Sequence, residues 1–174
     1  MLNVEGINQL ADDLVRDDAR YDQGYWGYNT KHLEGREGEE SPFFGTACGT
    51  VACLAGFCMA RKIGVTEFNK VAAIYPGISG DSARFYGAQQ LGIPFEAVIF
   101  NDIGDWPSDL RQEYRNAKPR GRVLVALKAL QRLRPDGSID PDPDVVHTPL
   151  KQLNALLEEK AYCESAKEAS DDQV

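Results

Sequence analysis

The chain has 174 residues, enough for one domain with a hydrophobic core, and its 43% hydrophobic and 26% charged residues are typical of a globular protein. Its formal net charge of −8 argues against general affinity for nucleic acids or anionic membranes. The longest apolar run, residues 51–60, is too short to span a membrane, and the N-terminus lacks the basic start and apolar run of a secretory signal. We therefore expect a cytoplasmic protein without a membrane partner.

The N-terminal part of the chain is predicted to hold one helix followed by irregular structure. Apolar residues recur at helical spacing over Val4–Arg16, which predicts an amphipathic helix. The aromatic, glycine-rich run 21–28 favours an extended segment that packs Tyr25 and Trp26 against the core. Residues 34–42, EGREGEESP, combine glycine with charge and predict a mobile loop.

The central element is predicted to be a helix over Val51–Lys62. Its apolar residues cover every face, so the helix must be buried all round. Thr50 has a side chain suited to cap the first turn, and Gly64 follows two basic residues as a typical C-terminal stop. Gly56 inside this apolar helix predicts that another backbone segment approaches closely.

Further helices are expected downstream, and most of them carry recognisable end signals. Asp81 is the expected N-cap of the first and Gly92 its terminator, while Ser108 is the expected cap of a later one. Strand signals are confined to 72–75 and 145–147. The expected helical ranges are Asp81–Leu91, Pro94–Phe100, Ser108–Asn116, Gly121–Leu133 and Thr148–Tyr162.

These patterns together predict the fold class and the organisation of the chain. We expect a mainly α protein with a single compact globular domain over 1–164, built around the buried helix at about 51–62 and leaving room for a small β element. Residues 135–147 form a loop rich in proline and aspartate, and residues 165–174 are expected to be a disordered tail.

The chain contains four cysteines, Cys48, Cys53, Cys58 and Cys163. Three of them cluster closely, whereas a secreted disulfide framework spreads its cysteines to link loops. We interpret them as reduced thiols that act as small buried apolar residues, and a Cys48–Cys53 bridge remains an alternative. On a helix their spacing turns the side chains to different faces, so we expect no metal site, and no cofactor motif is present.

The run CGTVACLAGF, Cys48–Phe57, is the most distinctive part of the sequence. It resembles a C-G-T-x-x-C-x-A-G segment found in small uncharacterised proteins of phages and bacteria. The likeness continues loosely through Leu91–Ile93, Phe100 and Trp106–Pro107. The resemblance implies a phage or mobile-element protein that acts in the host cytoplasm, and it implies no particular reaction.

The same run has a weaker likeness to the papain-like peptidases that process bacteriocin leaders. Those enzymes carry a cysteine, a glycine and then A-C-L-A at the start of their central helix, which resembles Cys48-Gly49 followed by Ala52–Ala55. The resemblance implies a thiol hydrolase with Cys48 as nucleophile, because a helix N-terminus favours thiolate, and His147 is the candidate partner. The family's glutamine before the cysteine, and its histidine followed by an apolar strand, are absent.

A basic block lies within this otherwise acidic chain. Residues 111–134 contain eight Lys or Arg residues and one acid. The block could bind phosphate, RNA or an acidic partner, or it could pair with the protein's own acids or form a solvated face. It is the only candidate surface for nucleic acid, a partner that the net charge disfavours. The candidate binding residues are Arg115, Lys118, Arg120 and Arg122.

We expect a small accessory protein that binds a host or cellular protein as an inhibitor or modulator, rather than an enzyme. The papain-like thiol hydrolase is one alternative. A second is an acidic mimic of nucleic acid, in which the loop acids would make the contacts. Asp102 and Asp105, beside Trp106, fit either a catalytic carboxylate pair or a capped turn. The candidate contact residues of the mimic are Glu34, Glu37, Glu39 and Glu40.

Overall fold

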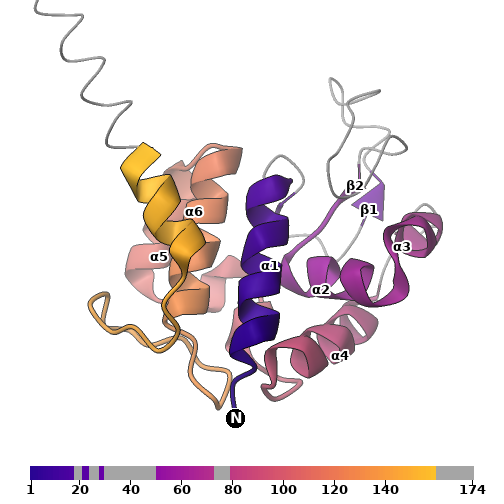
Figure 1. The fold of residues 1–174 in the computed structure, drawn as a ribbon, viewed down its shortest axis with the longest axis horizontal. Coiled ribbons are helices and arrows are strands. Elements are labelled where there is room, and N and C mark those ends of the chain that lie inside the picture. The colour runs from indigo at the N-terminus through magenta and orange to yellow at the C-terminus, as the bar shows by residue number, and fades with distance from the viewer. Residues whose placement is uncertain (18–20, 24–27, 30–49, 73–78, 160–174) are drawn as a thin grey trace, which may run out of the picture.

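The computed structural model describes residues 1–17, 21–23, 28–29, 50–72 and 79–159, and it confirms the mainly α fold (Figure 1). A last helical segment covers residues 151–159. Within these ranges no helix has the length and apolar character needed to cross a membrane. The elements are α1 (Val4–Arg16), β1 (Tyr28–Asn29), β2 (Thr50–Val51), α2 (Leu54–Ile63), α3 (Val65–Ala72), α4 (Gly80–Leu91), the 3-10 turns η2 (Val98–Phe100) and η3 (Ile103–Asp105), α5 (Ser108–Asn116) and α6 (Pro119–Gln131).

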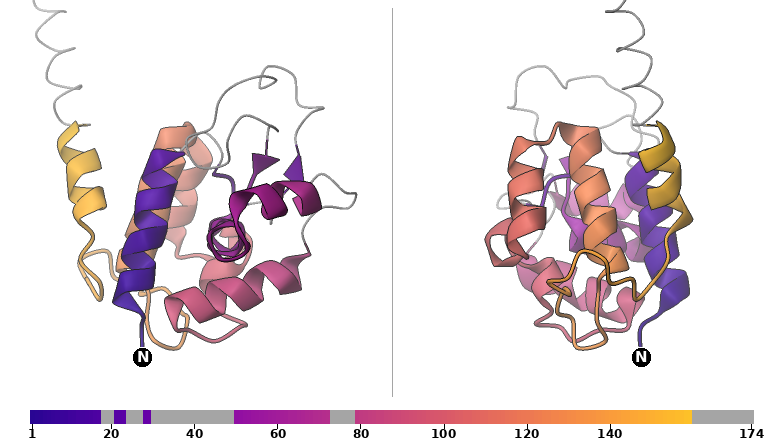
Figure 2. Two further views of the ribbon diagram at one scale, coloured as in Figure 1. Left: turned by 45° about the vertical axis from the view of Figure 1, so that its right-hand side comes forward. Right: turned by 90° about the vertical axis from the view of Figure 1, so that its left-hand side faces the viewer.

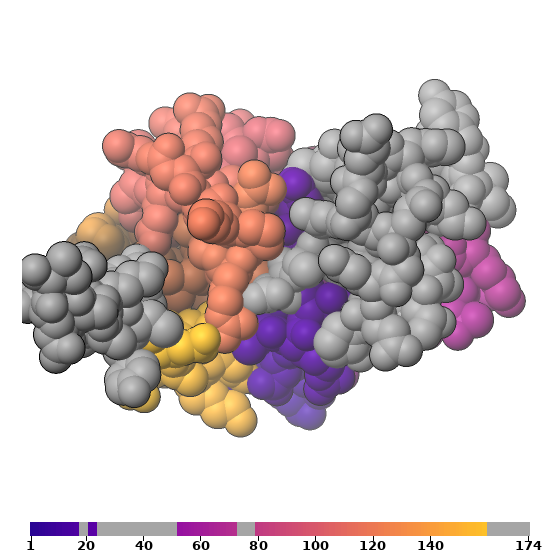
Figure 3. Space-filling model, turned by 90° about the horizontal axis from the view of Figure 1, so that it is seen from above, coloured from indigo at the N-terminus to yellow at the C-terminus, as the bar shows by residue number. Residues whose placement is uncertain are grey.

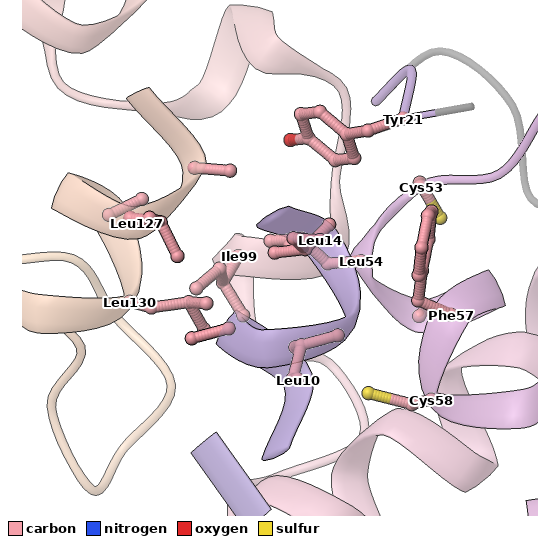
Figure 4. Packing of buried hydrophobic residues seen from close by; sticks show 14 of the residues in the cluster. Leu10, Leu14, Tyr21, Cys53, Leu54, Phe57, Cys58, Ile99, Leu127 and Leu130 are labelled. Atoms are coloured by element: carbon pink, nitrogen blue, oxygen red, sulfur yellow. The ribbon is translucent and has the colours of Figure 1, made fainter. Parts of the chain in front are cut away.

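Helix α2 lies at the centre of the packing, as the sequence predicts. Its first seven residues, Leu54 to Ala60, are all buried. The helix contacts α1, α3 and α4, and Figure 4 shows Leu54 beside Leu14 of α1 within the shared core. The residues of this cluster come from helices that are distant in sequence, so the apolar side chains of each helix are buried by those of the others.

The start of the central helix differs from the prediction. The helix begins at Leu54 rather than Val51, and its N-cap is Cys53 rather than Thr50. Thr50 and Val51 instead form β2, which pairs antiparallel with Tyr28–Asn29. Both residues are β-branched, and a strand accommodates their stiff side chains better than a helix does. The small β element therefore precedes the central helix.

The other two strand signals do not form strands where the structure describes them. Ala72 is the last residue of α3, a helix that was not predicted, and residues 73–75 lie outside the described residues. Residues 145–147 form no strand and lie in the irregular segment that follows α6. The predicted mobile loop 34–42 and tail 165–174 also lie outside the described residues, and so do Tyr25 and Trp26.

Helix ends elsewhere follow the predicted signals with small shifts. Ser79, not Asp81, caps α4, because its side chain accepts a hydrogen bond from the Ser82 amide. Helix α5 has the predicted bounds. Its N-cap, however, is Pro107, which has no side-chain capping bond, and Ser108, the predicted cap, is the first residue of the helix. Gly92, with φ of +67°, ends α4 as expected. Three other predicted helices have different bounds in the structure. Of the predicted helix Pro94–Phe100, only the 3-10 turn Val98–Phe100 forms. The predicted helix Gly121–Leu133 runs over Pro119–Gln131, and the predicted helix Thr148–Tyr162 is helical over 151–159 among the described residues.

Two glycines that the sequence did not single out let α4 pack closely. A Cβ atom on Gly6 of α1 would lie 2.0 Å from the Gln90 carbonyl oxygen. A Cβ atom on Gly87 of α4 would lie 2.6 Å from the Phe100 ring. The Gly6 contact is with backbone, so the crossing of α1 and α4 requires glycine there, whereas a larger residue at position 87 would have to displace the Phe100 ring. Gly56 is buried in α2, and its expected backbone contact stays a prediction.

The last helical segment lies against α1 (Figures 2 and 3). The Gln152 side-chain amide donates to Oδ1 of Asp12 at 2.6 Å, while Leu153 and Leu156 are buried. This contact joins the two ends of the described chain.

Candidate functional site

The thiols of the described chain are buried and held in the protonated form. Cys48 lies outside the described residues, whereas Cys53 and Cys58 are both buried. Cys53 occupies the helix N-terminus that the peptidase resemblance assigned to Cys48. Burial raises the pKa of Cys53 to about 11 even though the amides of α2 oppose the shift, and burial also raises the pKa of Cys58. Burial therefore disfavours the reactive thiolate form of both residues at neutral pH.

A buried glutamine organises the backbone next to Cys53. The Gln23 side-chain amide donates to the carbonyl oxygens of Ile99 and Asn101, each at 3.0 Å. Its Oε1 accepts from the Tyr21 hydroxyl at 3.1 Å and from the Leu54 amide at 3.4 Å. The sequence analysis did not identify Gln23. Its one signal in the sequence is that it is the single amide side chain in the aromatic run 21–28. Its bonds tie the start of α2 to the segment after α4, which is a structural role.

His147 belongs to a cluster that fastens the loop after α6. Its Nε2 lies 3.1 Å from Oδ2 of Asp140, and Arg134 binds the same oxygen at 2.6 Å. The Asp142 amide, Arg134 and His147 together lower the pKa of Asp140 to about 2. The His147 backbone amide donates to the Gln131 carbonyl at the end of α6. Figure 1 shows this loop at the opposite end of the fold from β2, which follows Cys48 in sequence.

Most of the basic block pairs with the protein's own acids, which was one of the predicted alternatives. Arg122 pairs with Asp22 and in addition lies over the Tyr114 ring, 5.2 Å from its centroid. Arg115 and Lys118 are exposed and form no ion pair with the described residues. Five pairs use cations of the block: Arg120–Glu159, Arg122–Asp22, Lys128–Glu113, Arg132–Asp109 and Arg134–Asp140.

The predicted acidic candidates are either structural or outside the described part of the chain. Asp102 caps the turn η3, because its Oδ1 accepts from the Gly104 amide at 2.8 Å, so the capped-turn interpretation is confirmed for this residue. Asp105 is exposed in the same turn. The four candidate glutamates of the loop, Glu34, Glu37, Glu39 and Glu40, lie outside the described residues.

A polar groove runs between α1, the end of α2 and α4. Its volume is about 370 Å³. The Asn3 side chain donates to the Gln90 carbonyl and the Gln90 side chain donates to the Gly6 carbonyl, so these amides also join the two helices. Lys62 forms no ion pair with the described residues. The lining residues are Asn3, Gln9, Arg61, Lys62, Tyr86, Gln89 and Gln90.

An exposed aromatic ring stands beside this groove. Phe85 of α4 keeps 51% of its surface accessible. Its ring meets the ring of the lining residue Tyr86 edge to face, with the centroids 5.5 Å apart.

Within the described ranges no group of three or more His, Cys, Asp or Glu residues could hold a metal ion. Comparisons of the chain with protein-family models, curated proteins and solved structures find no match.

Proposed function

We propose that this protein is a non-enzymatic accessory protein that binds another protein, and that the groove between α1 and α4 is the contact surface. The proposal includes the origin that the sequence resemblance implies, a phage or mobile element, with the partner in the host cell. The observation that carries it is the exposed ring of Phe85 beside the groove. Aromatic side chains, Phe among them, are enriched at protein interfaces, where they act as anchors.

The lining of the groove supports a peptide-like ligand. Gln89 carries an amide that can both donate and accept, while the amide nitrogens of Gln9 and Gln90 donate within the protein and leave their carbonyl oxygens as acceptors. Such groups can match the alternating donors and acceptors of an extended backbone. Lys62 adds one positive charge for an acidic side chain of the partner. A ring for anchoring next to amides for orientation is the usual division of roles in a binding site.

The proposal is tested by comparing two exposed apolar residues. Phe85→Ser removes the ring beside the groove, and Leu157→Ser removes an apolar side chain that is 40% exposed on the last helix, away from it. Tagged wild-type protein and both variants are expressed in the native cell, and bound proteins are quantified by mass spectrometry. We expect Phe85→Ser to reduce recovery of the partner at least about tenfold, equivalent to about 1.4 kcal/mol, and Leu157→Ser to leave it unchanged.

Two outcomes contradict the proposed surface. One is equal recovery of the partner by Phe85→Ser and wild type, and the other is an equal loss with Leu157→Ser. If no protein is enriched over an unrelated tagged protein, the binding function itself is wrong. Thermal melts of both variants must match the wild type, since exposed substitutions normally change stability by less than about 0.5 kcal/mol.

The two alternative functions stay predictions. The thiol hydrolase depends on Cys48, and the nucleic-acid mimic depends on Glu34 and its neighbours, all outside the described residues. The described residue of the first alternative, His147, is engaged by Asp140. If Cys48→Ser abolishes a cellular activity that Phe85→Ser leaves intact, the hydrolase becomes the better proposal.

A further inference from the structure

Helix α5 lies on the far side of α6 from α1 (Figure 2, right), and its side chains line a second concave surface. The hollow has a volume of about 320 Å³. Its lining residues recur at helical spacing, so they share one face of the helix. All of them can donate hydrogen bonds and none is a carboxylate: Ser108, Arg111, Gln112, Arg115 and Asn116.

The acids of α5 do not line this hollow, which explains why it is positive. The helix contains two acids, and both are bound by cations: Asp109 by Arg132, the C-cap of α6, at 2.5 Å, and Glu113 by Lys128 of α6 at 2.7 Å. Both acids of α5 are therefore paired with cations, on a partly exposed flank of the helix. Arg111 and Arg115 supply the charge of the outer side.

The two arginines are arranged to hold oxyanions. Arg111 Nη1 donates to the Gly104 carbonyl at 2.9 Å, which orients the guanidinium and leaves further donors available. Arg115 is exposed and lies one helical turn further along. Guanidinium groups at this spacing are neighbours, and each matches a carboxylate through two parallel hydrogen bonds.

We propose that this hollow, the α5 arginine site, binds an acidic peptide segment by receiving two of its carboxylates. The site is distinct from the groove between α1 and α4, and the inference does not depend on the proposed function. A peptide fits better than a nucleic acid, because a chain with a net charge of −8 and only two arginines in the hollow repels an extended polyanion. The ligand is recognised by its charge and by the fork geometry of arginine.

The test uses amide and arginine side-chain NMR signals of the full chain. A capped tetraglutamate peptide is titrated in, with a capped tetraglutamine peptide and inorganic phosphate as comparison ligands. We expect tetraglutamate alone to shift the signals of Arg111, Arg115 and Asn116 strongly, with an affinity that falls as salt is added. The double variant Arg111→Gln/Arg115→Gln should weaken binding at least tenfold.

Matched variants separate charge, geometry and folding. Arg111→Lys/Arg115→Lys keeps both charges but removes the planar fork, so we expect a smaller loss than for the glutamine variant. Lys70→Gln/Lys151→Gln removes two exposed charges elsewhere and should bind as the wild type does. Arg115→Gln alone serves if the loss of the Arg111 contact unfolds the double variant, and it should still weaken binding severalfold.

Three results would overturn the proposal. The first is that tetraglutamate shifts these signals no more than tetraglutamine does. The second is that the glutamine variants bind tetraglutamate as tightly as the wild type. The third is that phosphate saturates the arginine signals while tetraglutamate leaves them unmoved, which would reassign the site to phosphate.

Discussion

Between α2 and α1, an arginine is bound to a buried carboxylate: Nε of Arg61 in α2 lies 2.6 Å from Oδ2 of Asp13 in α1, whose side chain is fully buried. On the outer face of α5, Arg111 and Arg115 line an open hollow that contains no carboxylate. The residue type is the same, but the first arginine binds a buried carboxylate, whereas the other two form no ion pair with the described residues. The comparison shows that charge in a sequence indicates function only after the internal ion pairs are known.

Thiol reactivity should show the largest contrast between the interior and the surface. Burial raises the pKa of Cys53 to about 11, so at neutral pH this residue holds far less thiolate than an exposed cysteine, whose pKa is about 8.5. We expect Cys53 and Cys58 to resist iodoacetamide in the native protein and to react fully in guanidinium. Peptide-resolved alkylation rates measure this, and rapid native labelling of Cys53 would show that the interior opens to solvent.

The buried ion pair should respond asymmetrically to mutation. Arg61→Ala leaves the fully buried Asp13 carboxylate without its partner and should cost about 3–5 kcal/mol. Asp13→Ala leaves an arginine whose side chain is 35% exposed and can turn to water, so its cost should be smaller, about 1.5–3 kcal/mol. Urea unfolding of the two variants tests the order. Equal losses would mean that Asp13 reaches solvent without Arg61.

The apolar interior should be sensitive to lost volume. Leu54→Ala removes a fully buried side chain at the start of α2 and should destabilise the protein by about 2–5 kcal/mol, because the close-packed core leaves a cavity. Denaturant melts measure the change. Leu157→Ala on the last helix removes the same group from a partly exposed position and is the matched control. A loss below about 1 kcal/mol for Leu54→Ala would place α2 at the periphery.

The Asp140 cluster should contribute stability that depends on pH. The folded pKa of Asp140 is about 2, below the value near 3.9 of a free aspartate, so folding favours its charged form. This contribution is present at neutral pH and is lost as pH falls from about 4 through 2. Asp140→Asn should therefore be less stable than wild type at pH 7, with a difference that shrinks in acid. A difference that stays constant with pH would contradict the assignment.

The smallest effect should come from the outer face of α5. Arg115→Gln should change the free energy of unfolding by less than about 0.5 kcal/mol, because the exposed side chain has no ion pair with the described residues. Urea unfolding measures it beside Arg61→Ala. A loss above about 1 kcal/mol would give Arg115 a structural role and remove the contrast between the two regions.

Much of the fold was predictable because helical periodicity is a local property. The apolar spacing of α1, the all-round apolar character of α2 and the terminator Gly92 each depend on residues within a few turns. The bounds of α5 follow from the turn at Trp106–Pro107 in the same way. The candidate site was less predictable, since neither the groove between α1 and α4 nor its exposed Phe85 leaves a local pattern.

The sequence by itself determined the helical fold class, the buried centre and the presence of a basic block. Tertiary structure alone decided that α2 begins at Leu54, because Thr50 and Val51 pair with residues more than twenty positions away. It also decided which arginines are neutralised, since the partners of Arg61 and Arg122 lie far away in the chain. Periodicity acts over neighbouring residues, whereas strand pairing, ion pairs and grooves depend on which distant segments meet.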